Sequence, residues 1–254
     1  MEVLVLGSGG TAPWRDRACS SFLVDGSILV DAGPGSFLNF RRFCGATNGI
    51  VGVVITHMHG DHIFDLPALL WGMAADGRNN DLVIYGPKGI GKALEILFSE
   101  EYSSEFMPKN FVKFHVSVNE IEPGDTFNLG EYYFKTAPGI HPVKDISYRI
   151  EAGNSVVCFS GDTAYSKDLI ALSSGADLLV HESSFFEGEE GLAASFGHST
   201  SAQAGDVAKR AGVKFLLLSH ITPRLSGSEE RLKVEAEKNG VTASVARDGM
   251  DVLI

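Results

Sequence analysis

The hydrophobic positions of this chain fall into short runs that alternate between strand-like and helix-like spacing. Brief apolar runs rich in β-branched residues and bounded by turn residues are typical of β-strands. One such stretch, 21–33, predicts two strands joined by an Asp25-Gly26 turn. Strands are predicted at 3–6, 21–33, 49–56, 82–85, 111–118, 132–136, 146–150, 155–160, 177–180, 214–219, 241–245 and 251–253.

Helical spacing separates many of these strands. Pro67 fits the first turn of one helix, where proline is tolerated. Helices are predicted at 36–43, 65–75, 88–99, 200–211 and 229–239. No sequence repeat or linker divides the chain, so we expect one domain over residues 1–254. The pattern predicts an α/β (α+β) protein in which two sheets pack face to face with helices outside.

Composition and charge narrow the possible partners. No run approaches the roughly 18 apolar residues of a membrane span, and the N-terminus lacks the features of a signal peptide, so we expect a cytoplasmic protein without a membrane partner. The net charge of −11 disfavours extended nucleic-acid binding but permits a small anionic substrate. The three cysteines, Cys19, Cys44 and Cys158, are widely spaced, which predicts buried thiols rather than a disulfide or zinc framework.

A cluster of metal-ligating residue types follows one of the predicted strands, in the stretch "ITHMHGDH" (55–62). His57 and His59 are two residues apart on an extended segment, so their imidazoles point the same way. Asp61 and His62 follow Gly60, where the backbone can turn, and are placed to serve a second ion. A lone HxH is a weak signal, whereas HxHxDH is much more specific.

Three further candidate ligands lie just beyond the ends of other predicted strands. They are His141 in "APGIHP", Asp162 in "SGDT" and His220 in "LLLSHI". Loops at the carboxyl ends of strands commonly carry function in sheet proteins. Metal-ligating residues therefore follow four predicted strands at the same structural position, which predicts one shared metal site.

On these motifs the chain resembles the metallo-β-lactamase superfamily and, within it, the ribonuclease Z-like branch. The resemblance covers nearly the whole chain and is carried by "LGSGG" (6–10), "DAGPGS" (31–36), "THMHGDHIFDLPALL" (56–70), "HPVKDISYRI" (141–150), "SGDT" (160–163), "HESSF" (181–185), "GHSTSAQAGDVAKRAGV" (197–213) and "SHITPR" (219–224).

The resemblance implies a fold, a ligand set and two catalytic residues. The fold is the four-layer αββα sandwich with the site along one edge. One metal is bound by His57, His59 and His141, the other by Asp61, His62 and His220, and Asp162 bridges the two. His198 in "GHST" matches the residue that donates a proton to the leaving group, and Asp61 also assists the attacking water.

One departure from the family pattern bears on the substrate. Members that mature tRNA carry a protruding arm between the segments that match His141 and Asp162, and this arm grips the tRNA body. Here 20 residues separate the two positions, and they are predicted to form two strands joined by Gly153-Asn154. The missing arm and the acidic charge disfavour tRNA 3′ endonuclease activity.

The ligand set itself suggests a reaction. Two divalent ions generate hydroxide at neutral pH and clamp both oxygens of an in-line displacement. Zinc suits an imidazole-rich site, with manganese or iron as alternatives. His198 directly precedes a predicted helix, whose free N–H groups attract phosphate oxygens. A histidine that only stabilises the helix start is the alternative, but the neighbouring ligands favour the acid.

Three secondary candidates complete the site and its surroundings. Asp31 in "DAG" either accepts a hydrogen bond from a ligand imidazole or is a plain turn residue. Glu182 is a candidate for orienting His198. The apolar helix 65–75 is most simply part of the core, and it could also form a homodimer contact.

The hypothesis that follows is a dinuclear-zinc phosphodiesterase acting on small phosphodiesters, such as a cyclic nucleotide or a short nucleic-acid 3′ end. A metal-dependent ester, lactone or sulfate-ester hydrolase is the main alternative. A tRNA 3′ endonuclease and a metal-binding protein without turnover are two others, and the intact ligands and His198 argue against the last.

Overall fold

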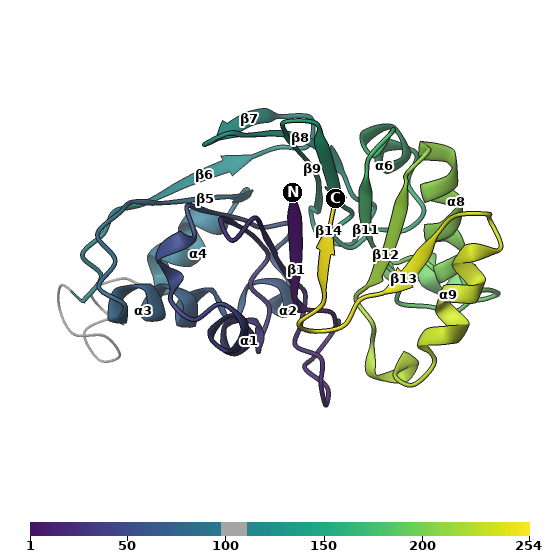
Figure 1. The fold of residues 1–254 in the computed structure, drawn as a ribbon, viewed down its shortest axis with the longest axis horizontal. Helices are drawn as coiled ribbons and strands as arrows, with labels where there is room; N and C mark the ends of the chain where they lie inside the picture. The colour runs from purple at the N-terminus through teal and green to yellow at the C-terminus, as the bar shows by residue number, and fades with distance from the viewer. Residues whose placement is uncertain (98–110) are drawn as a thin grey trace.

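The computed structural model describes residues 1–97 and 111–254, and within them two seven-stranded sheets pack against each other (Figure 1). The strand order of the first sheet is β14-β1-β2-β3-β4-β5-β6, and that of the second is β13-β12-β11-β10-β9-β8-β7. The first sheet contains β1 (Glu2–Gly7), β2 (Ser21–Val24), β3 (Ile28–Val30), β4 (Gly52–Val54), β5 (Leu82–Pro87), β6 (Val116–Ile121) and β14 (Asp251–Leu253). The second contains β7 (Thr126–Leu129), β8 (Tyr132–Pro138), β9 (Ile146–Ala152), β10 (Ser155–Phe159), β11 (Leu178–Glu182), β12 (Phe215–Ser219) and β13 (Ala243–Val245).

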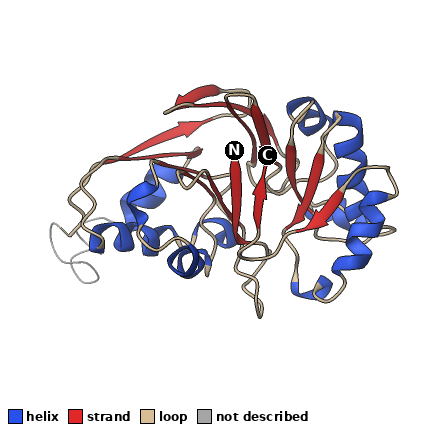
Figure 2. Ribbon diagram, viewed as in Figure 1, coloured by secondary structure: helices blue, strands red, loops and turns tan. Residues whose placement is uncertain are grey.

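Helices cover the outer face of each sheet (Figure 2). Over the first sheet lie α1 (Ser36–Phe43), α3 (Leu66–Ala75) and α4 (Ile90–Leu97), and over the second lie α6 (Lys167–Leu172), α8 (Ser201–Ala211) and α9 (Glu229–Glu237). The remaining helical elements are η1 (Thr47–Gly49), α2 (Gly60–Ile63), α7 (Glu190–Phe196) and η2 (Pro223–Leu225). The arrangement confirms the predicted αββα layering.

The central core lies between the two sheets and joins them into one body. Val5 and Val54 of the first sheet are buried in the same cluster as Phe134, Tyr148 and Leu217 of the second. Two hydrogen bonds tie the sheets together close to the end of β4: the Tyr148 hydroxyl donates to the Ile55 carbonyl over 2.8 Å, and the Ile146 N–H donates to Thr56 over 2.9 Å. The segment that follows β4 is therefore held from both sides.

Several sequence predictions are corrected by the structure. The strand predicted at 111–118 begins only at Val116, and the helix predicted at 88–99 begins at Ile90, with its last residues outside the described ranges. The strand predicted at 49–56 is reduced to β4, and β7, α2, α6 and α7 were not predicted. Cys44 is exposed, unlike Cys19 and Cys158, because the chain leaves α1 for the surface there. None of the described helices is long and apolar enough to span a bilayer.

Candidate dinuclear metal centre

The ends of parallel strands bring the candidate ligands to one edge of the sandwich. The strands β3, β4 and β5 run parallel, as do β10, β11 and β12. His57 lies shortly after the end of β4, Asp162 after β10, and His220 directly after β12. His141 follows β8, which has the same direction as β10 because β9 is antiparallel to both. The four segments therefore meet at their carboxyl ends, as predicted.

Local conformation divides the HxHxDH stretch between two groups of ligands. His59 has an extended backbone (φ −68°, ψ 148°), and the short helix α2 begins at the next residue, Gly60. His57 and His59 thus lie on an extended segment, whereas Asp61 and His62 lie on the first turn of α2 and face a second position. Because of this turn, four side chains that are neighbours in the sequence face two different points in space.

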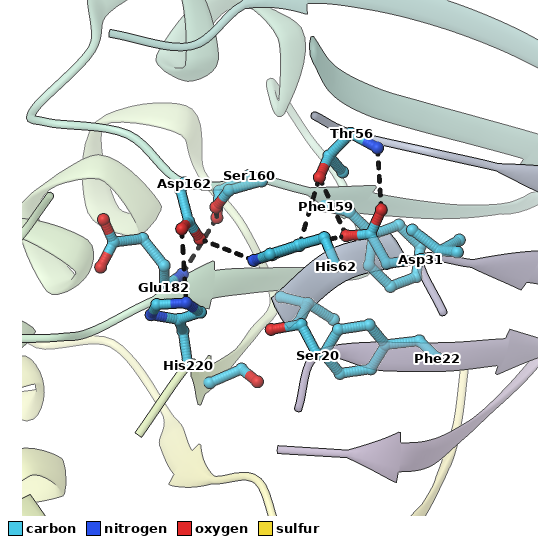
Figure 3. Close-up of a pocket in the computed structure, with 14 residues that line it drawn as sticks. Ser20, Phe22, Asp31, Thr56, His62, Phe159, Ser160, Asp162, Glu182 and His220 are labelled. Carbon is cyan, nitrogen blue, oxygen red and sulfur yellow. Dashed lines mark hydrogen bonds and ion pairs between the residues drawn. The ribbon is translucent and has the colours of Figure 1, made fainter. Parts of the chain in front are cut away.

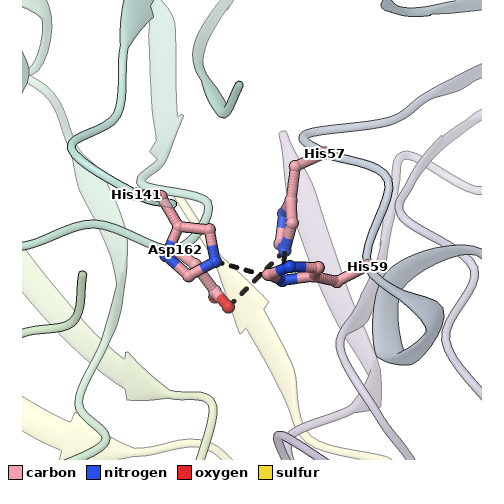
Figure 4. A group of neighbouring side chains, drawn as sticks. All are labelled: His57, His59, His141 and Asp162. Atoms are coloured by element: carbon pink, nitrogen blue, oxygen red, sulfur yellow. Dashed lines mark hydrogen bonds and ion pairs between the residues drawn. The ribbon is translucent and has the colours of Figure 1, made fainter. Parts of the chain in front are cut away.

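The first group consists of His57, His59, His141 and Asp162 (Figure 4). The Nε2 atoms of His57 and His141 each lie 3.1 Å from Nδ1 of His59. Oδ2 of Asp162 lies 3.7 Å from Nε2 of His57. The three imidazoles and the carboxylate therefore converge on one point, from one segment of the first sheet and two of the second.

The second group consists of Asp61, His62, Asp162 and His220, most of which are visible in Figure 3. Nε2 of His220 lies 3.2 Å from Oδ2 of Asp61 and 3.3 Å from Oδ2 of Asp162. Nε2 of His62 lies 3.5 Å from Oδ1 of Asp162. Asp162 belongs to both groups, so its two oxygens are placed to bridge two ions.

The outer ring nitrogens are occupied, which leaves the inner nitrogens as lone-pair donors. Nδ1 of His62 lies 2.7 Å from Asp31, and Nδ1 of His141 lies 2.9 Å from the carbonyl of Gly197. Nδ1 of His57 lies 3.0 Å from a carboxylate oxygen of Asp145. Because carboxylates and carbonyls only accept, Nδ1 of each of these three histidines carries the proton and its Nε2 presents a lone pair to the centre. These tautomers are assigned from the partners.

Two buried atoms point to cations at this centre. Nε2 of His62 and Oδ1 of Asp162 are buried without any hydrogen-bond partner, although such groups are almost always satisfied. Ligand atoms bonded to one tetrahedral zinc at about 2.0–2.1 Å lie roughly 3.3–3.4 Å from one another. The distances of 3.1–3.7 Å across the first group lie around this value. The residues present therefore fit two divalent ions.

Charge and burial hold His57 and Asp162 in the ionisation states that metal binding requires. Burial and, next to it, the neighbouring charge of His62 lower the pKa of His57 to about 3, so this imidazole is neutral near pH 7. Burial alone would raise the pKa of Asp162, but His220 and His62 hold it well below its ordinary value. Neutral imidazoles and ionised carboxylates are the forms that bind divalent cations.

His198 and Glu182 form a separate pair beside the second group. Nδ1 of His198 lies 2.9 Å from Oε1 of Glu182, and the His198 ring stacks on His220 with centroids 5.3 Å apart. Burial would lower the pKa of His198, but the hydrogen bond and charge of Glu182 raise it to about 9. Glu182 itself is fixed by N–H groups of Thr163 and Ser199. The geometry gives His198 a bound proton and a partner that orients the ring.

Asp61 is less buried than the other ligands of its group. Its side chain is 14% exposed, and Oδ2 accepts a hydrogen bond from the Thr11 N–H over 2.7 Å. A carboxylate at the open side of the centre can contact a water molecule as well as an ion.

The structure brings together all seven predicted ligands and His198, and it places Asp31 against His62 and Glu182 against His198. Asp31 accepts hydrogen bonds from the Thr56 N–H and hydroxyl as well as contacting His62, so it is more than a turn residue. Sequence reasoning missed Asp145, although it lies in the quoted stretch "HPVKDISYRI". In the sequence, Asp145 stands out only as a lone acidic residue directly before a strand of buried residues.

Comparison with known proteins identifies the family. A model of the β-lactamase superfamily domain matches residues 27–221. The ribonuclease Z of Methanothermobacter thermautotrophicus is 30% identical over 99% of this chain and 96% of its own length. The crystal structure of the metallo-β-lactamase fold protein YhfI from Bacillus subtilis superposes with a TM-score of 0.84, 27% identity and 99% coverage of both chains.

A further solved structure agrees in fold. The short form of human tRNase Z superposes with a TM-score of 0.83 over 100% of this chain and 99% of that one, at 24% identity. Together with the geometry of the centre, these matches show that the chain belongs to the metallo-β-lactamase superfamily and, within it, to the ribonuclease Z-like branch, a group of metal-dependent hydrolases.

Proposed function

We propose that the chain is a dinuclear-zinc phosphodiesterase that acts on small phosphodiesters, such as a cyclic nucleotide or a short nucleic-acid 3′ end. The observation that carries the proposal is the pair of ligand groups sharing Asp162, with His198 poised beside them. In this assignment His57, His59 and His141 hold one ion, Asp61, His62 and His220 hold the other, and Asp162 contacts both. Five imidazoles among seven ligands favour zinc over harder ions such as magnesium.

The charge of the centre supports an anionic substrate. Two divalent ions bring a charge of +4, and the carboxylates of Asp61 and Asp162 reduce it to roughly +2, while the five imidazoles are neutral ligands. A phosphodiester carries one negative charge and fits this site better than an uncharged ester does. The negative net charge of the whole chain, −11, makes this local positive site the attractive feature for a small anion.

When bound, a pair of divalent ions lowers the pKa of water and neutralises charge on the phosphoryl oxygens. The residues of the chain supply the proton transfers. The Asp61 carboxylate faces the open side of the centre and orients the attacking water. His198, whose Nδ1 is held by Glu182, presents Nε2 to the departing oxygen and donates its proton there. General acid catalysis of this kind is worth about 10²–10⁴ in rate.

The length of the chain supports a small substrate. The segment between His141 and Asp162 consists mainly of the β9–β10 hairpin and contains no inserted arm. The alignment with the M. thermautotrophicus enzyme runs over 303 positions, whereas this chain has 254 residues, so at least 49 positions have no counterpart here. A substrate held mainly by the centre itself agrees with this difference.

A second candidate is RNA 3′ processing, because relatives across nearly the full chain carry the name ribonuclease Z. The B. subtilis enzyme of that name is 28% identical over 95% of this chain. In this alternative the body of the RNA is bound without an arm between His141 and Asp162.

Activity assays with a defined substrate panel distinguish these functions. The zinc-loaded protein is given bis(4-nitrophenyl) phosphate, a 2′,3′-cyclic nucleotide, a precursor tRNA, a lactone and a sulfate ester, each with and without chelator. His198→Ala tests the acid, and His115→Ala, an exposed histidine just before β6, is the matched control. We expect phosphodiester turnover that chelator abolishes and that only His198→Ala lowers, by 10²–10⁴.

Three other outcomes overturn the proposal in different ways. Efficient precursor-tRNA cleavage would favour the second candidate. Lactone or sulfate-ester turnover without phosphodiester turnover would assign the centre to another ester. A protein that binds two ions and turns over none of the panel would be a metal-binding protein.

The predicted homodimer also remains a proposal. Phe64, directly after α2, is 70% exposed, and Trp71 on α3 is 40% exposed. Leu38 on α1 is 63% exposed. Large apolar side chains exposed on these helices suit a contact between two copies. Analytical ultracentrifugation at micromolar concentration measures whether the mass is that of one chain or two.

A further inference from the structure

The loop between β1 and β2, residues 8–20, lies against the second ligand group. This β1–β2 loop projects beyond the end of β1 in Figure 1. Its Thr11 N–H donates to Oδ2 of Asp61 over 2.7 Å. Its Gly10 packs so closely on His220 that a Cβ would lie 2.3 Å from the imidazole ring. The loop therefore contacts two of the proposed ligands of one ion.

The hydrogen bond from Thr11 fixes the orientation of the Asp61 carboxylate. Oδ2 of Asp61 also lies 3.2 Å from Nε2 of His220, so this oxygen is the one that faces the second group. An oxygen with two lone pairs can accept the N–H and still contact an ion. Because Oδ2 is held, the carboxylate does not turn about its Cβ–Cγ bond, and its other oxygen keeps one direction. A fixed direction is what a carboxylate needs in order to orient a water molecule.

Thr11 is held in an uncommon backbone conformation. Its φ is 70°, in the left-handed region that β-branched residues rarely adopt. Such a conformation persists only where the surrounding structure enforces it. Trp14 and Arg17 close the tip of the loop through two backbone hydrogen bonds of 2.9 Å each. This closure shapes the tip, so the place of Thr11 relative to Asp61 depends on how the base of the loop is attached.

One carboxylate, that of Asp248, holds both ends of the β1–β2 loop. Asp248 lies in the turn between β13 and β14 and belongs to neither ligand group. Its Oδ1 accepts the N–H and the hydroxyl of Ser8, over 2.9 and 2.6 Å. Its Oδ2 accepts the Ala18 N–H over 2.6 Å and the side-chain amide of Asn39 over 2.8 Å. The carboxylate thus sets the distance between the first and last parts of the loop.

A buried arginine completes this attachment. Arg17 is 6% exposed and donates to the Ser8 hydroxyl and the Ala246 carbonyl over 2.7 Å each. It also pairs with Glu229 at 3.0 Å, so its charge is compensated, as a buried charge requires. The Ser8 hydroxyl accepts from Arg17 and donates to Asp248, which joins the three side chains into one network.

We propose that Asp248 is a positioning residue for Asp61, acting through the β1–β2 loop and the N–H of Thr11. Removal of its carboxylate releases both ends of the loop, Thr11 leaves its left-handed conformation, and Asp61 loses the donor that fixes it. For turnover, the inference rests on the proposed phosphodiesterase function. The link from Asp248 to Thr11 is a property of the chain itself and requires no bound ion.

Two variants compare Asp248 with a carboxylate that has similar contacts elsewhere. Asp248→Ala removes the attachment of the loop. Asp76→Ala is the matched control, because Asp76, directly after α3, also accepts a backbone N–H and a hydroxyl, both from Thr47, and a bond from Arg41. Ser8→Ala removes one of the hydrogen bonds to Asp248 and is the milder variant. Its measurements decide the question if Asp248→Ala does not fold.

Three measurements follow the effect from the loop to the reaction. Amide hydrogen exchange, observed by NMR on the metal-free protein, gives the protection of the Thr11 N–H. Competition with a chromophoric chelator gives the zinc affinities, and bis(4-nitrophenyl) phosphate hydrolysis gives kcat and KM. We expect Asp248→Ala to lower the Thr11 protection, the zinc affinity of the second group and kcat, each by about tenfold or more, with KM nearly unchanged. Ser8→Ala should lower the same three quantities by about two- to threefold, and Asp76→Ala should change none.

Separate outcomes would overturn the positioning role and the proposed function. Unchanged Thr11 protection in folded Asp248→Ala would show that the carboxylate does not hold the loop. Lost protection with unchanged zinc affinity and kcat would show that Asp61 does not depend on Thr11. An equal fall in kcat for Asp248→Ala and Asp76→Ala would attribute the effect to stability. Lost protection and weaker zinc binding at the second group, in a protein that hydrolyses no phosphodiester, would instead overturn the proposed function and leave the positioning role standing.

Discussion

At the scale of single residues, Asp145 contacts a residue of each ligand group's framework, His57 and Asp162, although it belongs to neither group. Its side chain is fully buried, 3.0 Å from Nδ1 of His57, and it also accepts the N–H of Asp162 over 3.0 Å. It therefore positions one histidine of the first group and the shared carboxylate. Burial and the charge of Asp162 raise the pKa of Asp145 well above its ordinary value, and bound cations would favour its ionised form.

We predict that Asp145→Ala weakens metal binding 10- to 100-fold at the first group. One oxygen, Oδ2, lies 3.0 Å from both Nδ1 of His57 and the Asp162 N–H, so the substitution removes the acceptor that orients His57. Competition with a chromophoric zinc chelator measures both affinities. Asp168→Ala, on the exposed face of α6, is the control and should keep both. Unchanged zinc binding in Asp145→Ala would show that the contact has no role in orienting His57.

Gly10 is a second residue whose effect comes from its position. A Cβ there would lie 2.3 Å from ring atoms of His220, so even one methyl group requires that imidazole to move. We predict that Gly10→Ala lowers zinc affinity at the second group and phosphodiester turnover, each by at least tenfold. Gly191→Ala is matched, since its Cβ would meet no atom within 4 Å. Full activity in Gly10→Ala would mean that the loop carrying Gly10 adjusts without moving His220.

At the scale of elements, the start of α8 determines where His198 lies. The Thr200 hydroxyl accepts the Gln203 N–H over 3.2 Å, and the Gln203 side chain accepts the Thr200 N–H over 3.0 Å. This reciprocal capping box begins the helix two residues after His198. It connects the stability of α8 with the orientation of the candidate acid.

We predict that Thr200→Ala lowers the free energy of unfolding by about 1 kcal/mol, as loss of a helix cap does, and also lowers kcat. Ser166→Ala removes the cap of α6, where the Ser166 hydroxyl accepts the Leu169 N–H over 3.2 Å, away from His198. It should cost a similar free energy and leave kcat unchanged. Urea denaturation and steady-state kinetics on both variants make the comparison. An equal fall in kcat for the two would attribute the effect to stability alone.

The elements also show how far the sequence could predict the fold. The helices α1 and α8 were predicted to within one residue, because they have helical spacing and clear ends. Six-residue α6 and seven-residue α7 were missed, since so few positions show no distinct period. The strand at β6 was placed too early because residues 111–118 alternate in polarity before they pair with β5.

For the candidate site, sequence motifs pointed to the proposed ligands and to His198. They did not point to residues that reach the site only because segments far apart in the sequence meet in the fold. The seven ligands and His198 carry recognisable spacing or flanking residues. Asp145 and Ser184 do not: the Ser184 hydroxyl lies 2.8 Å from Nδ1 of His220, yet the two residues are 36 positions apart. Contacts of this kind depend on strand pairing between β11 and β12, which the sequence pattern does not specify.

At the scale of the whole molecule, the candidate centre lies where the two sheets meet. The first sheet contributes His57, His59, Asp61 and His62 through the segment after β4, and the second contributes His141, Asp162 and His220 through three separate loops. Each ligand group therefore contains residues from both halves of the sandwich. Ions bound there connect the halves, and the unfolded chain has no such preformed sites.

This arrangement predicts that removing the metal lowers the stability of the entire protein. Free zinc at 100 times its dissociation constant stabilises the folded state by about 2.7 kcal/mol per site. For a chain of this size each kcal/mol shifts the melting temperature by roughly 2–4 °C. Chelator should therefore lower the melting temperature of the zinc-loaded protein by about 5–20 °C in calorimetry. The double variant His59→Ala/His220→Ala removes one ligand from each group, and its melting temperature should hardly respond to chelator. A wild-type melting temperature that is indifferent to chelator, at a zinc content of two ions per chain, would show that the ions do not hold the two sheets together.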